Sequence, residues 1–93
     1  MKYRSRTDIA AAILEKAQGG AIKTRIMYRA FLSFPQLKEY LEVLTDSGLL
    51  EYSDKEKEYA TTEKGRRFLQ MYSEVAQTIS PQNNRARKTS SAA

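Results

Sequence analysis

The sequence of 93 residues contains no cysteine and no histidine. Disulfide bonds, thiolate nucleophiles and the usual structural zinc sites are therefore excluded. The imidazole group, a frequent general base, is also missing. No glycine-rich phosphate loop, HExxH motif or paired-acid motif compensates for these absences, so no set of residues suggests catalysis. We expect a protein that is not an enzyme and that has no catalytic residue, metal site or cofactor.

Long hydrophobic runs are missing as well. No segment approaches the roughly 20 apolar residues that cross a bilayer, and the first residues, MKYRSRTD, lack the apolar stretch of a signal peptide. We expect a soluble protein of the cytoplasm, without a membrane partner.

The net charge of +5 is unevenly distributed along the chain. Residues 1–29 carry seven basic and two acidic side chains, whereas residues 30–61 carry three basic and seven acidic ones. The last segment, PQNNRARKTSSAA, has no large apolar residue, which predicts a disordered basic tail over residues 81–93. Its cationic side chains either bind a polyanion without regard to its sequence or play no part; they are Arg85, Arg87 and Lys88.

Two helices are predicted in the first third of the chain. Thr7 and Asp8 form an N-cap signal for the first helix, which ends at the Gly19-Gly20 pair. Its buried face is predicted to consist of Ile9, Ile13 and Ala17. A short second helix is expected at residues 24–30, with an apolar side made of Ile22, Ile26 and Met27.

A third helix and a hairpin follow. Ser33 and Gln36 have the spacing of a capping box, and Gly48 suits the left-handed end of the helix. The core side of this helix is predicted to be Leu37, Leu41 and Leu44. Residues 49–52 and 58–61 are short strand patterns separated by five polar residues, which predicts a β-hairpin with Tyr52 facing Tyr59.

The last predicted helix runs from about residue 62 to Pro81. Phe68, Tyr72, Val75 and Ile79 follow the 4-3-4 spacing of a coiled-coil seam. A core of roughly 75 residues is small, and oligomerisation commonly stabilises such domains. We therefore expect a homodimer whose interface consists of Phe68, Leu69, Tyr72, Val75, Ala76 and Ile79, although packing within one chain would also use part of this face.

The predicted fold is mainly α with a small β-hairpin, in the order of a winged helix-turn-helix domain. It divides into a head at residues 1–61, a dimerisation helix at residues 62–80 and the tail. The segments KTRIMY, LS, the Tyr and Leu of the third helix, and T-x-K-G resemble those of small archaeal winged-helix DNA-binding proteins. This resemblance implies an antiparallel dimer formed by the last helix, which binds double-stranded DNA in a chromatin-associated or transcriptional role.

Phosphate contacts are expected from the second helix, because Lys and Arg supply most of the affinity for DNA. Bases would be read by the start of the third helix, and phosphates touched by the wing, which is the hairpin. A basic arm of Lys2, Arg4 and Arg6 is also possible. The predicted DNA-binding residues are Lys23, Thr24, Arg25, Tyr28, Arg29, Ser33, Gln36, Lys38, Glu39, Tyr40, Lys55 and Lys57.

The acidic residues of the third helix leave two alternatives open. Glu42 and Asp46 are expected to face away from phosphates or to pair with basic side chains. The basic residues could also form no more than a solvated surface. In that case the acidic third helix and wing would bind a basic protein partner, because the fold does not decide the function.

Overall fold

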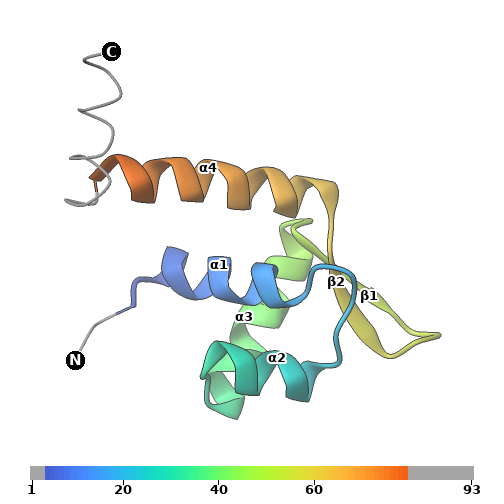
Figure 1. Cartoon of the computed structure of the whole chain (residues 1–93). Coiled ribbons are helices and arrows are strands. Elements are labelled where there is room, and N and C mark those ends of the chain that lie inside the picture. The colour runs from blue at the N-terminus through green and yellow to red at the C-terminus, as the bar shows by residue number, and fades with distance from the viewer. Residues whose placement is uncertain (1–3, 80–93) are drawn as a thin grey trace, which may run out of the picture.

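The computed structural model describes residues 4–79 and contains four helices and one hairpin in that range (Figure 1). Lys2 and the tail predicted for residues 81–93 lie outside it. The elements are α1 (Arg6–Lys16), α2 (Lys23–Ala30), α3 (Phe34–Asp46), β1 (Leu50–Ser53), β2 (Glu58–Thr61) and α4 (Glu63–Ile79). The predicted fold class and element order are confirmed. None of the described helices is long and apolar enough to cross a membrane.

Helix α1 begins one residue before the predicted N-cap. Ser5 is the N-cap: its hydroxyl accepts a hydrogen bond from the amide of Asp8 at 3.0 Å. The Asp8 carboxylate accepts in return from the amide of Ser5 at 3.1 Å. The prediction of Thr7 as the cap was wrong, because this reciprocal pair satisfies two free amides at once and places Thr7 inside the first turn.

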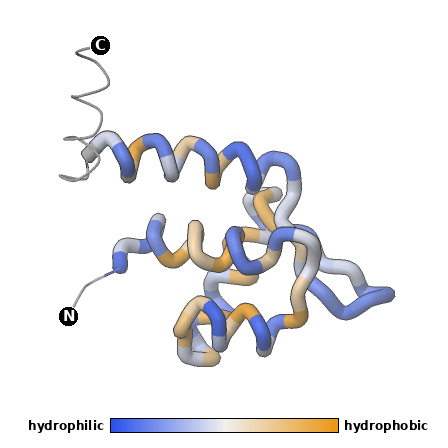
Figure 2. The backbone as a smooth tube through the Cα atoms, viewed as in Figure 1, coloured by the Kyte–Doolittle hydropathy of each residue, from blue (hydrophilic) through white to orange (hydrophobic). Residues whose placement is uncertain are grey.

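The core lies where α1, α2, α3 and the start of β1 meet. Figure 2 shows apolar positions on all of these elements, and α1 contacts both α2 and α4. The side chains that are almost completely enclosed are Ile13, Leu14, Ile26, Leu37 and Leu50. The predicted core faces of α1 and α3 are confirmed. Ile22, predicted on the apolar side of the second helix, is 45% exposed, because it is the extended N-cap of α2 and the helical spacing does not apply to it.

The end of α3 determines where the hairpin begins. Gly48 has a φ of +80°, and its amide donates to the carbonyl of Thr45. The amide of Leu49 donates to the carbonyl of Leu44 at 2.9 Å, which completes a Schellman motif. Leu49 therefore belongs to the helix end, and β1 starts one residue later than predicted.

The two strands pair in antiparallel register, with Tyr52 opposite Tyr59 as predicted. Their ring centroids lie 4.8 Å apart. The backbone of Tyr59 also exchanges two hydrogen bonds with Ala21, at 2.8 and 2.9 Å. The hairpin is therefore held against the segment that leads into α2.

Helix α4 starts in close contact with the end of α3. The hydroxyl of Thr62 accepts from the amide of Gly65 at 3.1 Å and donates to the carbonyl of Gly48 at 2.7 Å. Lys64 donates to the carbonyl of Ser47 at 2.9 Å. Gly65 is buried, and a methyl group there would collide with the carbonyl oxygen of Leu49. The T-x-K-G motif thus joins α4 to the rest of the domain.

Candidate nucleic-acid interface

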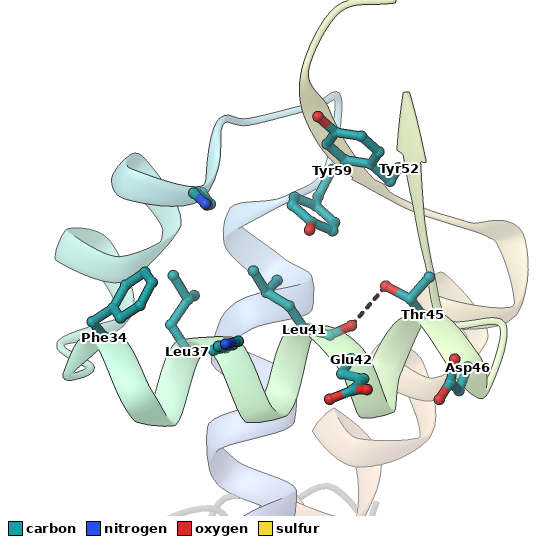
Figure 3. Close-up of a pocket in the computed structure, with 10 residues that line it drawn as sticks. Phe34, Leu37, Leu41, Glu42, Thr45, Asp46, Tyr52 and Tyr59 are labelled. Carbon is teal, nitrogen blue, oxygen red and sulfur yellow. Dashed lines mark hydrogen bonds between the residues drawn. The ribbon is translucent and has the colours of Figure 1, made fainter. Parts of the chain in front are cut away.

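Helix α3, the hairpin and the start of α2 surround a hollow of about 570 Å³ (Figure 3). A second hollow of about 390 Å³ continues it toward the hairpin turn. The two share Lys23, Tyr52 and Tyr59, and we call them together the α3–wing groove. Its other lining residues are Ile22, Thr24, Phe34, Leu37, Lys38, Leu41, Glu42, Thr45, Asp46 and Lys57.

Aromatic rings line the groove. Phe34 is 54% exposed and Tyr52 is 44% exposed, while the buried Leu37 and Leu41 lie between them in Figure 3. The ammonium group of Lys23 lies 5.8 Å from the centre of the Phe34 ring. Burial raises the pKa of Tyr59, with a further contribution from Tyr52. A phenol is already protonated at neutral pH when its pKa is the ordinary value of about 10, so the Tyr59 hydroxyl can donate a hydrogen bond.

Charges of both signs surround the groove. Lys23, Lys38 and Lys57 line it together with two carboxylates, Glu42 and Asp46. Both acids line the groove, and no ion pair in the described range includes them. The expectation that they face away from phosphates stays a prediction, because it depends on which ligand enters the groove. They lie toward the carboxyl end of α3, where the last turns run beside the hairpin (Figure 3).

Of the predicted DNA-binding residues, four line this groove: Lys23, Thr24, Lys38 and Lys57. Three others are exposed on α2 but do not line it: Arg25, Tyr28 and Arg29. Lys55 is exposed in the hairpin turn. Lys57 is 3.8 Å from Asp54, an exposed pair that constrains it little.

The side chains of Ser33 and Gln36 form hydrogen bonds that cap the start of α3. The predicted capping box is present: the side-chain oxygen of Gln36 accepts from the amide of Ser33 at 3.1 Å, and the hydroxyl of Ser33 accepts from the amide of Gln36 at 3.3 Å. A glutamine needs both its oxygen and its nitrogen to pair with adenine. Gln36 would therefore have to leave the cap in order to read a base.

Tyr40 and Glu39 face α1 rather than the groove. Tyr40 is only 6% exposed, so the prediction that it is available to DNA was wrong. The guanidinium of Arg6 lies 5.1 Å from the centre of the Tyr40 ring and 3.7 Å from the Glu39 carboxylate. The spacing along α3 places Tyr40 on the same side as the core leucines Leu37, Leu41 and Leu44, and α1 covers it there.

Two cations of the predicted basic arm lie in the described range, and both contact the domain. Arg4 donates two hydrogen bonds, to the carbonyls of Ala30 at 2.7 Å and Phe31 at 2.9 Å. It therefore caps the end of α2, while Arg6 lies against α3. The two hydrogen bonds hold Arg4 at the end of α2, whereas the exposed ion pair with Glu39 constrains Arg6 little.

The predicted dimer residues on α4 fall into two groups. Phe68 and Leu69 are partly buried against the core, and the hydroxyl of Tyr72 donates to the Asp8 carboxylate on α1. Ala76 lines a hollow between α1 and α4. Val75 is 58% exposed, as is Met71 at 65%, which the sequence pattern did not select. The side chain of Ile79 lies outside the described part.

Sequence reasoning missed Phe34, Tyr52 and Tyr59 as groove residues. The tyrosine pair was predicted, but only as a contact between strands. The alternation of side chains along a strand could have indicated that both tyrosine rings lie on the same face of the hairpin and can line a groove together. Which face of the hairpin meets α3 depends on the bridge to Ala21, and that contact is not visible in the sequence pattern.

Three helices followed by a hairpin, with the third helix exposed beside it, define a winged helix-turn-helix domain. A family model described as winged helix-turn-helix matches residues 3–80, and the chain belongs to this family. No curated protein sequence matches the chain.

A similar solved structure is the crystal structure of Sso10a-2, a DNA-binding protein from Sulfolobus solfataricus. The likeness has a TM-score of 0.78, with 23% sequence identity over 95% of each chain. At this level of identity the likeness establishes a common fold.

Proposed function

We propose that this chain binds double-stranded DNA as a homodimer, either as a transcriptional regulator or as a chromatin-associated protein of the nucleoid. The observation that carries the proposal is the convergence of Lys23, Lys38 and Lys57 on one groove beside the exposed side of α3. Lys23 at the start of α2 lines both hollows, Lys38 on α3 lines the first, and Lys57 in the hairpin turn lines the second. None of them is held by an ion pair to another element in the described range.

In this proposal the three elements have different tasks. Lys23 and Thr24 at the start of α2, and Lys57 in the wing, contact phosphates and orient the domain. Lys38 on α3 is placed to reach a guanine edge or a phosphate in the major groove. Arg25 and Arg29 extend the cationic surface along α2. The similarity to Sso10a-2, described as a DNA-binding protein, agrees with this reading.

The test is the binding of the full chain to duplex DNA over a series of salt concentrations. Phosphate contacts release counterions, so affinity should fall steeply with salt, and Lys23→Ala and Lys38→Ala should each lower the log-log slope by about 1. Lys16→Ala is the matched control, because Lys16 is exposed at the end of α1 and does not line the groove. No binding at about 50 mM salt, or a slope near zero, would refute the proposal.

Dimerisation is proposed to use the exposed side of α4. Met71 and Val75 are four residues apart, so they lie on the same face of the helix, and both are more than half exposed. Val75→Glu should give a monomer with an unchanged circular dichroism spectrum, as measured by sedimentation equilibrium. Gln70→Glu is a charge-matched control on the same helix. A monomeric wild-type chain at micromolar concentration would contradict the dimer.

A second candidate function is supported by Glu42 and Asp46. Two carboxylates lining the groove would repel phosphates but attract a basic protein segment. If Glu42→Lys leaves DNA binding unchanged and abolishes the binding of a lysine-rich peptide, the groove is a protein site. If the same variant strengthens DNA binding, the groove faces DNA.

A further inference from the structure

Phe31 has an unusual backbone conformation and an unusual exposure. It ends α2 with φ at 57° and ψ at 54°, the left-handed region that glycine or asparagine usually occupies at this position. Its side chain is 82% exposed, the highest value among the large exposed hydrophobic residues of the described range. A bulky residue in this conformation is strained. Burial of the ring does not offset the strain.

The surrounding structure holds Phe31 in this state. The amide of Phe31 donates to the carbonyl of Tyr28 at 3.3 Å, and Arg4 donates to the carbonyls of Ala30 and Phe31. The guanidinium of Arg4 comes from the segment before α1, far away in the sequence. The turn is therefore fixed with the ring pointing into solvent, and strain maintained in this way often serves a function.

The outer face of α2 continues this exposed surface. Tyr28 lies one turn before Phe31 and is 71% exposed. Arg25 and Arg29 lie three residues before and one residue after Tyr28, and both are exposed. In the described range none of these three side chains has a hydrogen bond or an ion pair. Helical spacing places Arg25 next to both Tyr28 and Arg29.

Two exposed aromatic rings with two guanidinium groups suit one kind of ligand. Unpaired bases have free π-faces that stack on aromatic side chains, while arginines bind the phosphates between them. The bases of a duplex are already stacked on each other and offer only their edges. A purely apolar partner would leave the two arginines without a counter-charge. The surface thus fits a single strand better than a duplex or an apolar partner.

We propose that Arg25, Tyr28, Arg29 and Phe31 form a second nucleic-acid site, which binds single-stranded segments by base stacking. None of these four residues lines the α3–wing groove. The two arginines also belong to the cationic surface proposed for duplex DNA, whereas the two aromatic rings serve this site alone. The chain would then hold unpaired nucleotides on α2, for example where a duplex has opened.

The experiment measures the anisotropy of a labelled oligothymidylate of about 15 nucleotides titrated with the full chain. Phe31→Asn and Tyr28→Ala should each weaken binding by roughly 5-fold or more, since one stacked base contributes about that much or more. Binding of a duplex should change by less than about twofold. Phe31→Asn should fold with the same or a higher Tm, because asparagine tolerates the left-handed conformation. A loss of binding therefore cannot be attributed to unfolding.

Two controls separate stacking from charge attraction. Lys38→Ala should weaken duplex binding and leave oligothymidylate binding intact. An abasic strand of the same length keeps its phosphates and should bind far more weakly than oligothymidylate. Equal binding of the two strands, no binding of oligothymidylate at all, or wild-type affinity in both aromatic variants would overturn this site. If the wild type binds oligothymidylate but no duplex, the groove proposal fails and the α2 site stands.

Discussion

The hydroxyl of Tyr72 on α4 donates a hydrogen bond to the carboxylate of Asp8 on α1. These residues are 64 positions apart, and their contact joins the last helix to the first. The same carboxylate accepts from the amide of Ser5 in the cap of α1. Asp8 therefore caps the start of α1 and also binds α4 to α1.

Removal of this contact should loosen α4. We expect Tyr72→Phe to lower the Tm, because the Asp8 carboxylate loses a donor while the ring stays in place. Tyr28→Phe is the control, since Tyr28 is largely exposed. The measurement is thermal unfolding by circular dichroism at neutral pH. Equal Tm values for the two variants would show that the contact does not contribute to stability.

The same pair should make stability depend on pH in both directions. The hydrogen bond from Tyr72, followed by that from Ser5, lowers the pKa of Asp8. Since the folded pKa lies below the unfolded value of about 3.9, this stabilisation is complete above that value and is lost as the pH falls through the folded pKa. Asp8→Asn should flatten the acid limb of a stability curve measured by urea unfolding.

At alkaline pH the stability is expected to fall as the pH rises, because Tyr72 loses its proton. The hydrogen bond to Asp8, followed by burial, raises the pKa of Tyr72. Stability from this group is complete below about pH 10 and is lost as the pH rises through the higher folded pKa. In an absorbance titration at 295 nm, Tyr72→Phe should remove a phenol that titrates above 10. A titration curve that loses only a phenol of ordinary pKa would contradict this assignment.

Gly65→Ala should destabilise the domain even though alanine favours helices by about 1 kcal/mol. The added methyl group would overlap the Leu49 carbonyl and the Thr61 side chain, so the start of α4 would have to shift. We expect a net loss of about 1–3 kcal/mol, or at least about 5 °C in Tm. Gln70→Ala, at an exposed position of α4, should change the Tm little. A rise in Tm for Gly65→Ala would refute the close approach.

Neutralisation of the groove carboxylates should strengthen DNA binding if the groove faces the duplex. Glu42→Gln and Asp46→Asn each remove a negative charge that repels phosphates, and a gain of a few-fold at low salt is expected from each. Glu74→Gln makes the same charge change on α4 and should have a smaller effect. An equal gain in all three variants would indicate that only the net charge matters.

Arg4→Gln should increase the mobility of the turn between α2 and α3. The two hydrogen bonds from Arg4 to the carbonyls of Ala30 and Phe31 would be lost. We expect faster hydrogen exchange at the amides of residues 30–32, with exchange in α4 unchanged. Lys16→Gln removes one charge without a contact of this kind. Unchanged protection at residues 30–32 would show that the cap does not contribute.

Local chemistry made much of the architecture predictable. The Ser33–Gln36 capping box, the glycine at the end of α3 and the leucine spacing define that helix without help from distant residues. The two short strand patterns define the hairpin and its tyrosine pair in the same way. Such signals involve only residues that are a few positions apart in the sequence, so they can be recognised without the tertiary structure.

The sequence by itself thus determined the elements, their order and the winged-helix class, because periodicity and capping are local. Only the tertiary structure decided which charges meet. It placed Arg4 and Arg6 on the domain, buried Tyr40 beneath α1 and turned Glu42 into the groove with Lys38. The reason is physical: the face that a side chain occupies follows from the element that packs against it, and such contacts join residues far apart in the chain.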